Sequence, residues 1–140
     1  PIDIKDQVVA LAVQSSDIVS DLDRQRLKVD CLEKGKKYAL LIDGHEIETL
    51  TADQLAEGVN LATRKTPMLE QANAVHKLTL KHADFHQRRW REIQVPNENY
   101  AAEAVQKVVD GLDALEAEMV KEQRKAAQPK ERKYVLEPTG

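Results

Sequence analysis

The stretch Tyr38–Gly58, YALLIDGHEIETLTADQLAEG, decides the fold of the chain around it. It begins with a β-prone apolar run, Tyr38–Ile42, and Asp43-Gly44 separates this run from a second one, His45–Leu50. Asp-Gly between two such runs is a strong hairpin motif, because both positions of the turn need a positive φ. The stretch therefore predicts two antiparallel strands joined by a tight turn.

Upstream of this hairpin the sequence predicts further strands. Val8–Val13 is a short apolar run of the kind found in buried strands. Leu27, Val29 and Cys31 alternate with charged residues, which is the pattern of a half-buried strand. We expect a three-stranded antiparallel meander over about residues 25–50, which the Val8–Val13 strand could join. Cys31 is then expected to be a small buried apolar residue.

Downstream the sequence predicts helices. Thr51 and Gln54 match a capping box, so a short helix over 52–57 should follow the hairpin. Thr66-Pro67 is a good helix start, and apolar residues at helical spacing predict a helix over about 67–93 that ends near Pro96. A second long helix is predicted over about 99–127. Because the connection is short, the two should form an antiparallel hairpin.

The second long helix carries an apolar seam with members 4, 3, 4, 3 and 4 residues apart: Ala101, Val105, Val108, Leu112, Leu115 and Met119. Such an a/d pattern must pack against a partner helix. The partner can be the first helix of the same chain, in which case the seam is structural. It can also be a second copy of the chain, and the seam is then a dimer interface.

Together these elements predict an α+β fold, in which a small antiparallel β meander is followed by a long antiparallel helical hairpin. Residues 1–60 form the β-rich segment, and residues 61–140 form the hairpin with an extended C-terminal tail that should dock through Tyr134–Leu136. The chain starts at Pro1 without an initiator Met. We therefore expect one structural unit cut from a larger protein.

Composition excludes several classes of protein. The net charge is −3 and only 4% of the residues are aromatic, which argues against a nucleic-acid partner. No apolar stretch is long enough to span a membrane, and no signal peptide is visible, so the localisation of the protein is left open. The single cysteine excludes an internal disulfide framework.

Residues for catalysis or metal binding are sparse. No Gly-x-Ser-x-Gly, Gly-Asp-Ser or Gly-rich phosphate loop occurs. His82 and His86 stand four apart on a predicted helix and could share one metal ion, but we favour an ordinary solvated polar face beside Lys81 and Arg88. Arg88, Arg89 and Arg91 around Trp90 fit a helix end, where cations favour the macrodipole. We expect no cofactor and no metal.

One part of the sequence is similar to a known family. Leu55–Ala62, LAEGVNLA, followed by Thr66-Pro67-Met68, resembles the C-terminal region of bacterial GDSL-like hydrolases of the SGNH fold. Weaker matches extend the resemblance over about residues 25–138 and include Arg89-Trp90-Arg91 and Val95-Pro96. The resemblance implies that the parent protein is a bacterial, secreted serine ester hydrolase: an esterase, an acylhydrolase or a carbohydrate esterase.

The catalytic blocks of that family do not transfer to this chain. The resemblance implies a Ser nucleophile in Gly-Asp-Ser, a His in Asp-x-x-His, and an oxyanion Asn in Gly-x-Asn-Asp. Gly58-Val59-Asn60-Leu61 has only part of the last block, so we expect a loop role for Asn60. The chain is therefore expected to be a non-catalytic accessory region whose partner is the catalytic domain of the parent chain. The alternative is a stand-alone interaction or dimerisation module that uses the helical seam.

Overall fold

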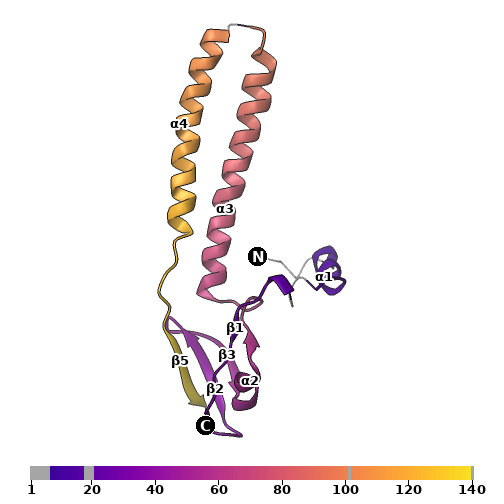
Figure 1. Ribbon diagram of the computed structural model, residues 1–140, viewed down its shortest axis with the longest axis vertical. Helices are drawn as coiled ribbons and strands as arrows, with labels where there is room; N and C mark the ends of the chain where they lie inside the picture. The colour runs from indigo at the N-terminus through magenta and orange to yellow at the C-terminus, as the bar shows by residue number, and fades with distance from the viewer. Residues whose placement is uncertain (1–6, 18–20, 101, 140) are drawn as a thin grey trace. The chain divides into compact units, whose positions relative to one another are not determined.

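The computed structural model describes residues 7–17, 21–100 and 102–139. The fold is α+β, as the sequence predicts. The chain divides into two compact units (Figure 1). The β-rich unit contains the described residues up to Glu70 and those from Lys130 onward, and the hairpin unit is Gln71–Pro129. The C-terminal tail, which the sequence grouped with the helices, is thus part of the β-rich unit.

The β-rich unit is organised around β2 (Lys37–Ile42), the central strand of a three-stranded antiparallel sheet. On one side β2 pairs with β3 (His45–Thr51) across the predicted turn, in which both Asp43 (φ 54°) and Gly44 (φ 81°) have a positive φ. On its other side β2 pairs with β5 (Tyr134–Thr139), the docked tail. A sheet of three antiparallel strands is present, but its third strand comes from the C-terminus.

The predicted strand around Leu27–Cys31 is mostly wrong. Only β1 (Arg26–Leu27) is a strand, and it pairs with β4 (Val59–Asn60) in a separate two-stranded sheet. Leu27 and Val29 are half-buried as expected, but the backbone turns at Cys31, whose φ is 68°. That left-handed residue breaks the two-residue period, so Cys31 is exposed and Leu32 is the next residue on the core side.

The predicted strand at Val8–Val13 is also wrong, because this run lies in helix α1 (Gln7–Gln14). Val8 and Leu11 are exposed. A short continuous apolar run is compatible with either a buried strand or a helix. The alanines at 10 and 12 favour the helix.

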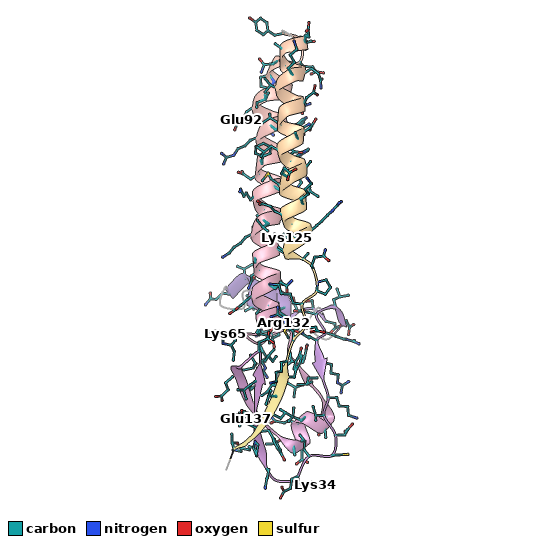
Figure 2. The ribbon with its side chains drawn as sticks, turned by 90° about the vertical axis from the view of Figure 1, so that its left-hand side faces the viewer. Lys34, Lys65, Glu92, Lys125, Arg132 and Glu137 are labelled. Atoms are coloured by element: carbon teal, nitrogen blue, oxygen red, sulfur yellow. The ribbon has the colours of Figure 1, made fainter. Side chains whose placement is uncertain are left out.

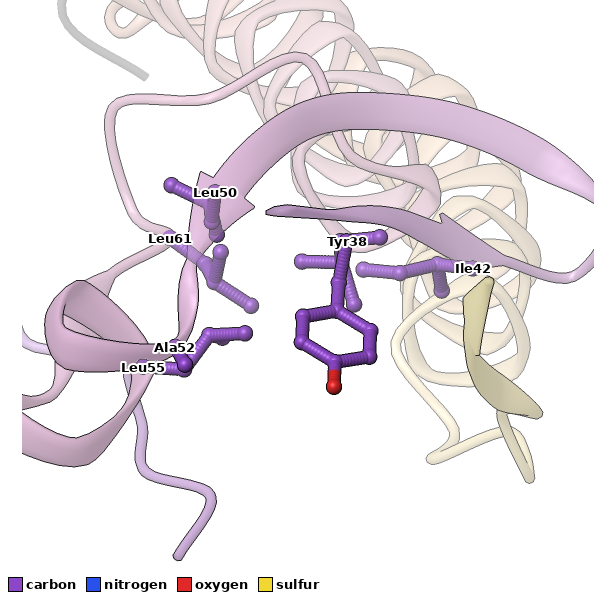
Figure 3. Packing of buried hydrophobic residues seen from close by; sticks show 7 residues of the cluster. Tyr38, Ile42, Leu50, Ala52, Leu55 and Leu61 are labelled. Atoms are coloured by element: carbon purple, nitrogen blue, oxygen red, sulfur yellow. The ribbon is translucent and has the colours of Figure 1, made fainter. Parts of the chain in front are cut away.

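The core of the β-rich unit lies where β2 meets the chain that follows β3 (Figure 3). Its buried members are Tyr38, Leu40, Ile42, Leu50, Ala52, Leu55 and Leu61. Two of them come from α2 (Ala52–Glu57), which starts at the predicted capping box. Thr51 Oγ1 accepts a hydrogen bond from Gln54 N, and Gln54 Oε1 accepts one from Thr51 N. A cap formed within four residues therefore positions Leu55 in the core.

The hairpin unit is built from two long helices that lie side by side in both views (Figures 1 and 2). Helix α3 (Pro67–Arg88) begins at Thr66, whose hydroxyl accepts a hydrogen bond from Leu69 N. It continues as a π-helix, η2 (Arg89–Gln94), and a 3₁₀ turn, η3 (Val95–Asn97). Pro96 lacks an N–H and therefore cannot continue the α-helical ladder. Helix α4 (Ala102–Ala126) returns along α3.

Candidate functional site

The side of α4 that faces α3 is marked by direct hydrogen bonds between the two helices. Gln71 Nε2 donates to Ala126 O at 2.8 Å, and Gln123 Nε2 donates to Leu78 O at 3.1 Å. These bonds join the N-terminal part of α3 to the last turns of α4 and so fix the antiparallel register of the two helices. They also show that half-buried amide side chains take part in the contact between the two helices.

The residues of the predicted seam lie in two different environments. Met119 is buried and Val105 and Leu112 are half-buried, whereas Val108 and Leu115 are about half exposed. Next to each of the two exposed members, the following residue of α4 is the better covered one: Val109 after Val108, and Glu116 after Leu115. The sixth member, Ala101, lies outside the described residues.

A cluster of charged and histidine side chains surrounds Glu116, whose side chain is 13% exposed. Its Oε2 lies 3.1 Å from Nη1 of Arg89, which is 12% exposed, and its Oε1 lies 3.1 Å from Nδ1 of His86. His82 Nε2 lies 4.0 Å from Oε2. Asp113 forms a second ion pair with Arg89. Two acids of α4 thus face two histidines of α3 and Arg89, the first residue of η2.

The electrostatics of this cluster favour the ionised carboxylate. Burial raises the pKa of Glu116, but the hydrogen bond with His86 and the positive charge of Arg89 lower it by more. The net effect is that the pKa of Glu116 lies below its usual value of 4.5. The carboxylate therefore stays charged and paired at neutral pH.

The two histidines predicted as possible metal ligands, His82 and His86, do lie near a common carboxylate. Arg89 lies against that same carboxylate, however, and a fixed cation is a poor neighbour for a metal ion. Within 7–17, 21–100 and 102–139, no three His, Cys, Asp or Glu side chains are arranged to hold a metal. The arrangement is that of an ion-pair network between two helices.

Asn60, the residue that superficially resembles an oxyanion donor, holds a loop together. Its Oδ1 accepts hydrogen bonds from Gln25 N at 2.9 Å and Ala62 N at 3.1 Å, and its Nδ2 donates to Asp23 O at 2.9 Å. Both ends of the amide are therefore used to join two backbone segments. The expected structural role thus holds for the side chain, but Asn60 lies in strand β4, paired with Arg26, rather than in a loop.

Glu116 and Arg89 were not predicted as a pair. Leu115 satisfies the a/d spacing, so the pattern places the apolar neighbour in the seam and Glu116 outside it. One sequence feature could have found the pair. Glu116 lies 3 and 7 residues from Met119 and Val109, both buried, and a helix repeats its faces at these intervals.

Among the described residues, no helix is long and apolar enough to cross a membrane. This finding covers the helices of both units.

Comparisons with known proteins find a similar fold but do not identify a family. No family model matches the chain, and no curated protein matches it. Among solved structures, a gut microbial diltiazem-metabolizing enzyme is similar, with a TM-score of 0.67 and 22% sequence identity. The match covers 91% of this chain and 36% of that enzyme's chain. The chain thus shares its fold with a part of that enzyme and spans about a third of its length.

Proposed function

We propose that this chain is the non-catalytic C-terminal accessory region of an SGNH-type, GDSL-like ester hydrolase, and that it helps to cover, shape or assemble the catalytic domain. The observation that carries the proposal is the unequal coverage in the structural comparison. Nearly all of this fold, 91%, is matched inside an enzyme of which it makes up 36%. A fold that recurs as a minor part of an enzyme is well suited to an accessory role.

The sequence supports the same proposal from another direction. The Gly58–Met68 region resembles the C-terminal part of the family, while the Ser, His and oxyanion blocks have no counterpart in the sequence. The polar groups that could imitate them have structural partners instead. Asn60 clamps a loop, and Glu116 is paired with Arg89 and His86.

A direct test compares ester hydrolysis by three proteins. The first is this chain alone, the second is the full-length product of its gene, and the third is that product without these residues. With p-nitrophenyl acetate and with diltiazem as substrates, we expect no hydrolysis above background by the chain alone. We expect activity from the full-length protein, and lower activity or lower stability after the deletion.

The control for this test is a double variant of the chain, Ser15→Ala with Ser16→Ala, which removes two adjacent, exposed hydroxyl groups. Hydrolysis by the chain alone that the double variant abolishes would contradict the proposal. A gene that encodes no Gly-Asp-Ser block upstream of Pro1 would contradict it as well.

The alternative function is a stand-alone module that dimerises through α4. The observation in its favour is that Val108 and Leu115, two members of the predicted seam, are 50% and 49% exposed. Analytical ultracentrifugation over a wide concentration range separates the two functions. A concentration-dependent dimer that Leu115→Glu dissociates supports the module, and a strict monomer excludes it.

A further inference from the structure

The end of the hairpin at which the two helices are connected contains a cleft. The cleft lies between η2 and the first turns of α4 and has a volume of about 330 Å³. Trp90, Val95 and Val109 give it apolar walls, and Gln94, Glu98 and Gln106 supply polar groups. We call it the tip cleft. A volume of roughly 300–1,000 Å³ is typical of small-molecule sites, so the tip cleft is at the small end of that range.

The wall formed by η2 has an unusual backbone. Val95 N donates to Trp90 O, five residues back, which is the hydrogen bond of a π-helix. Single π turns are rare, and they frequently occur at functional sites. Here the wider turn lies directly before Pro96 and carries Trp90, whose side chain is 51% exposed. An indole beside an open cleft offers a large apolar surface against which a ligand can pack.

The charge of the tip cleft restricts what it can bind. Glu98 is the one charged residue among those that line it, and no ion pair of Glu98 is found within the described part of the chain. An indole face attracts cations, and a carboxylate beside it adds to that attraction. An anion would be repelled by Glu98. A neutral apolar ligand would pack against Trp90 but would gain no attraction from the carboxylate of Glu98.

We propose that the tip cleft binds a small organic cation, namely an ammonium group on an aromatic or alkyl body, with the body against Trp90 and the ammonium near Glu98. All of the residues that line the site lie within the hairpin unit, so the site can be tested in this chain without a catalytic domain. For an open cleft of this size we expect a dissociation constant of about 1 mM.

The experiment uses the whole 140-residue chain and exploits the fact that Trp90 is its one tryptophan. Benzyltrimethylammonium is the cationic probe and benzyl alcohol is the neutral control, both at constant ionic strength. Binding is followed by the fluorescence of Trp90 and by the NMR signal of its indole N–H. We expect saturable changes with the cation, and affinity at least about threefold weaker for the alcohol.

Two glutamate variants separate a local effect from a general effect of charge. Glu98→Gln should weaken binding of the cation about threefold, as expected for an exposed ion pair. Glu103→Gln makes the same change in charge at a residue that does not line the tip cleft, and it should leave binding unchanged. Far-UV circular dichroism checks that both variants retain their helices.

Three outcomes would overturn the proposal. The first is the absence of a saturable change up to about 20 mM of the cation. The second is equal affinity for benzyl alcohol, which would indicate an apolar socket without charge selectivity. The third is equal weakening by Glu98→Gln and Glu103→Gln, which would indicate nonspecific attraction to an acidic surface.

Discussion

Arg89 and Glu116 face each other across the helical hairpin, with Nη1 and Oε2 3.1 Å apart and both side chains nearly buried, at 12% and 13% exposure. Few side chains of the hairpin are as well covered, since Val109 and Met119 are the buried residues of α4 and α3 has none. An ion pair in such a thin core is specific to one register of the two helices. It therefore opposes slippage of one helix along the other.

Glu116→Ala should destabilise the hairpin by about 2 kcal/mol, because it leaves Arg89 largely buried with Asp113 as its remaining acidic partner. Urea denaturation followed by the fluorescence of Trp90 measures this, since Trp90 lies in the hairpin unit. The control is the double variant Arg89→Met with Glu116→Leu, which replaces the pair by apolar groups. It should recover most of the stability. A double variant that is as unstable as the sum of both single variants would contradict the pairing.

Acidification should weaken the hairpin through Glu116. Because the pKa of Glu116 is lower in the folded chain than its usual 4.5, the unfolded chain binds the proton more readily. The stability contributed by this group is therefore fully present above about pH 4.5 and is lost as the pH falls through the lower, folded value. Other carboxylates, Asp43 among them, act in the same direction. The measurement is therefore the difference between the wild type and Glu116→Gln.

We expect the advantage of the wild type over Glu116→Gln to shrink as the pH is lowered from 6 to 3. Melting curves of both proteins, recorded across that range by circular dichroism at 222 nm, check the expectation. A difference in melting temperature that stays constant over the whole range would show that the charge of Glu116 does not contribute.

Local interactions in this chain are predictable from the sequence, because they involve residues that are close together. The Asp43-Gly44 turn, the capping box at Thr51 and the helix start at Thr66-Pro67 each involve no more than five residues. Their geometry follows from backbone preferences and from one or two hydrogen bonds. The structure has all three where the sequence predicts them.

Non-local pairings are not predictable in the same way. Leu40 pairs with Leu136 across almost a hundred residues, and no pattern in either segment specifies the other. The left-handed backbone at Cys31 is not predictable either, because a cysteine in an alternating pattern does not indicate a turn.

Asp43 should hold β5 on the sheet. Its Oδ2 accepts a hydrogen bond from Arg132 Nη1 at 2.8 Å and its Oδ1 accepts one from Lys133 N at 2.9 Å, directly before β5 begins. Asp43→Ala removes both bonds and places alanine at φ 54°, so it should cost about 2 kcal/mol. Asp43→Asn keeps an acceptor for Lys133 N and tolerates that φ, so it should cost clearly less. Hydrogen exchange of the β5 amides should be fastest in Asp43→Ala. Equal exchange rates in both variants would contradict this role.

Gly58 is required for two reasons that a matched pair of variants can separate. Its φ is 100°, and an added Cβ would lie 2.5 Å from Arg26 Nε. Gly35 also has a positive φ, 79°, but a Cβ there would meet no atom within 4 Å. Relief of the contact at Gly58 displaces the end of the Arg26 side chain, which donates a hydrogen bond to Glu57 O. Gly58→Ala should therefore cost somewhat more than Gly35→Ala, about 1.5 kcal/mol against about 1 kcal/mol. If the clash matters, Arg26→Ala should reduce the cost of Gly58→Ala. Urea denaturation followed by circular dichroism compares the wild type, the three single variants and the double variant Arg26→Ala with Gly58→Ala. Equal costs at the two glycines would leave backbone strain as the whole effect.

The adjacent valines of α4 provide the sharpest test of how the hairpin packs. Val108 belongs to the predicted seam but is 50% exposed, whereas Val109 is 4% exposed. Both gain the same helix propensity on mutation to alanine, so the difference between the two variants isolates the loss of burial. Val109→Ala should destabilise the hairpin by about 1.5 kcal/mol, and Val108→Ala should change its stability by less than about 0.5 kcal/mol. Urea denaturation followed by Trp90 fluorescence compares the two under identical conditions. If Val108→Ala were the more damaging variant, α4 would be rotated by one residue and would use the predicted seam, with Leu115 rather than Glu116 against its partner helix.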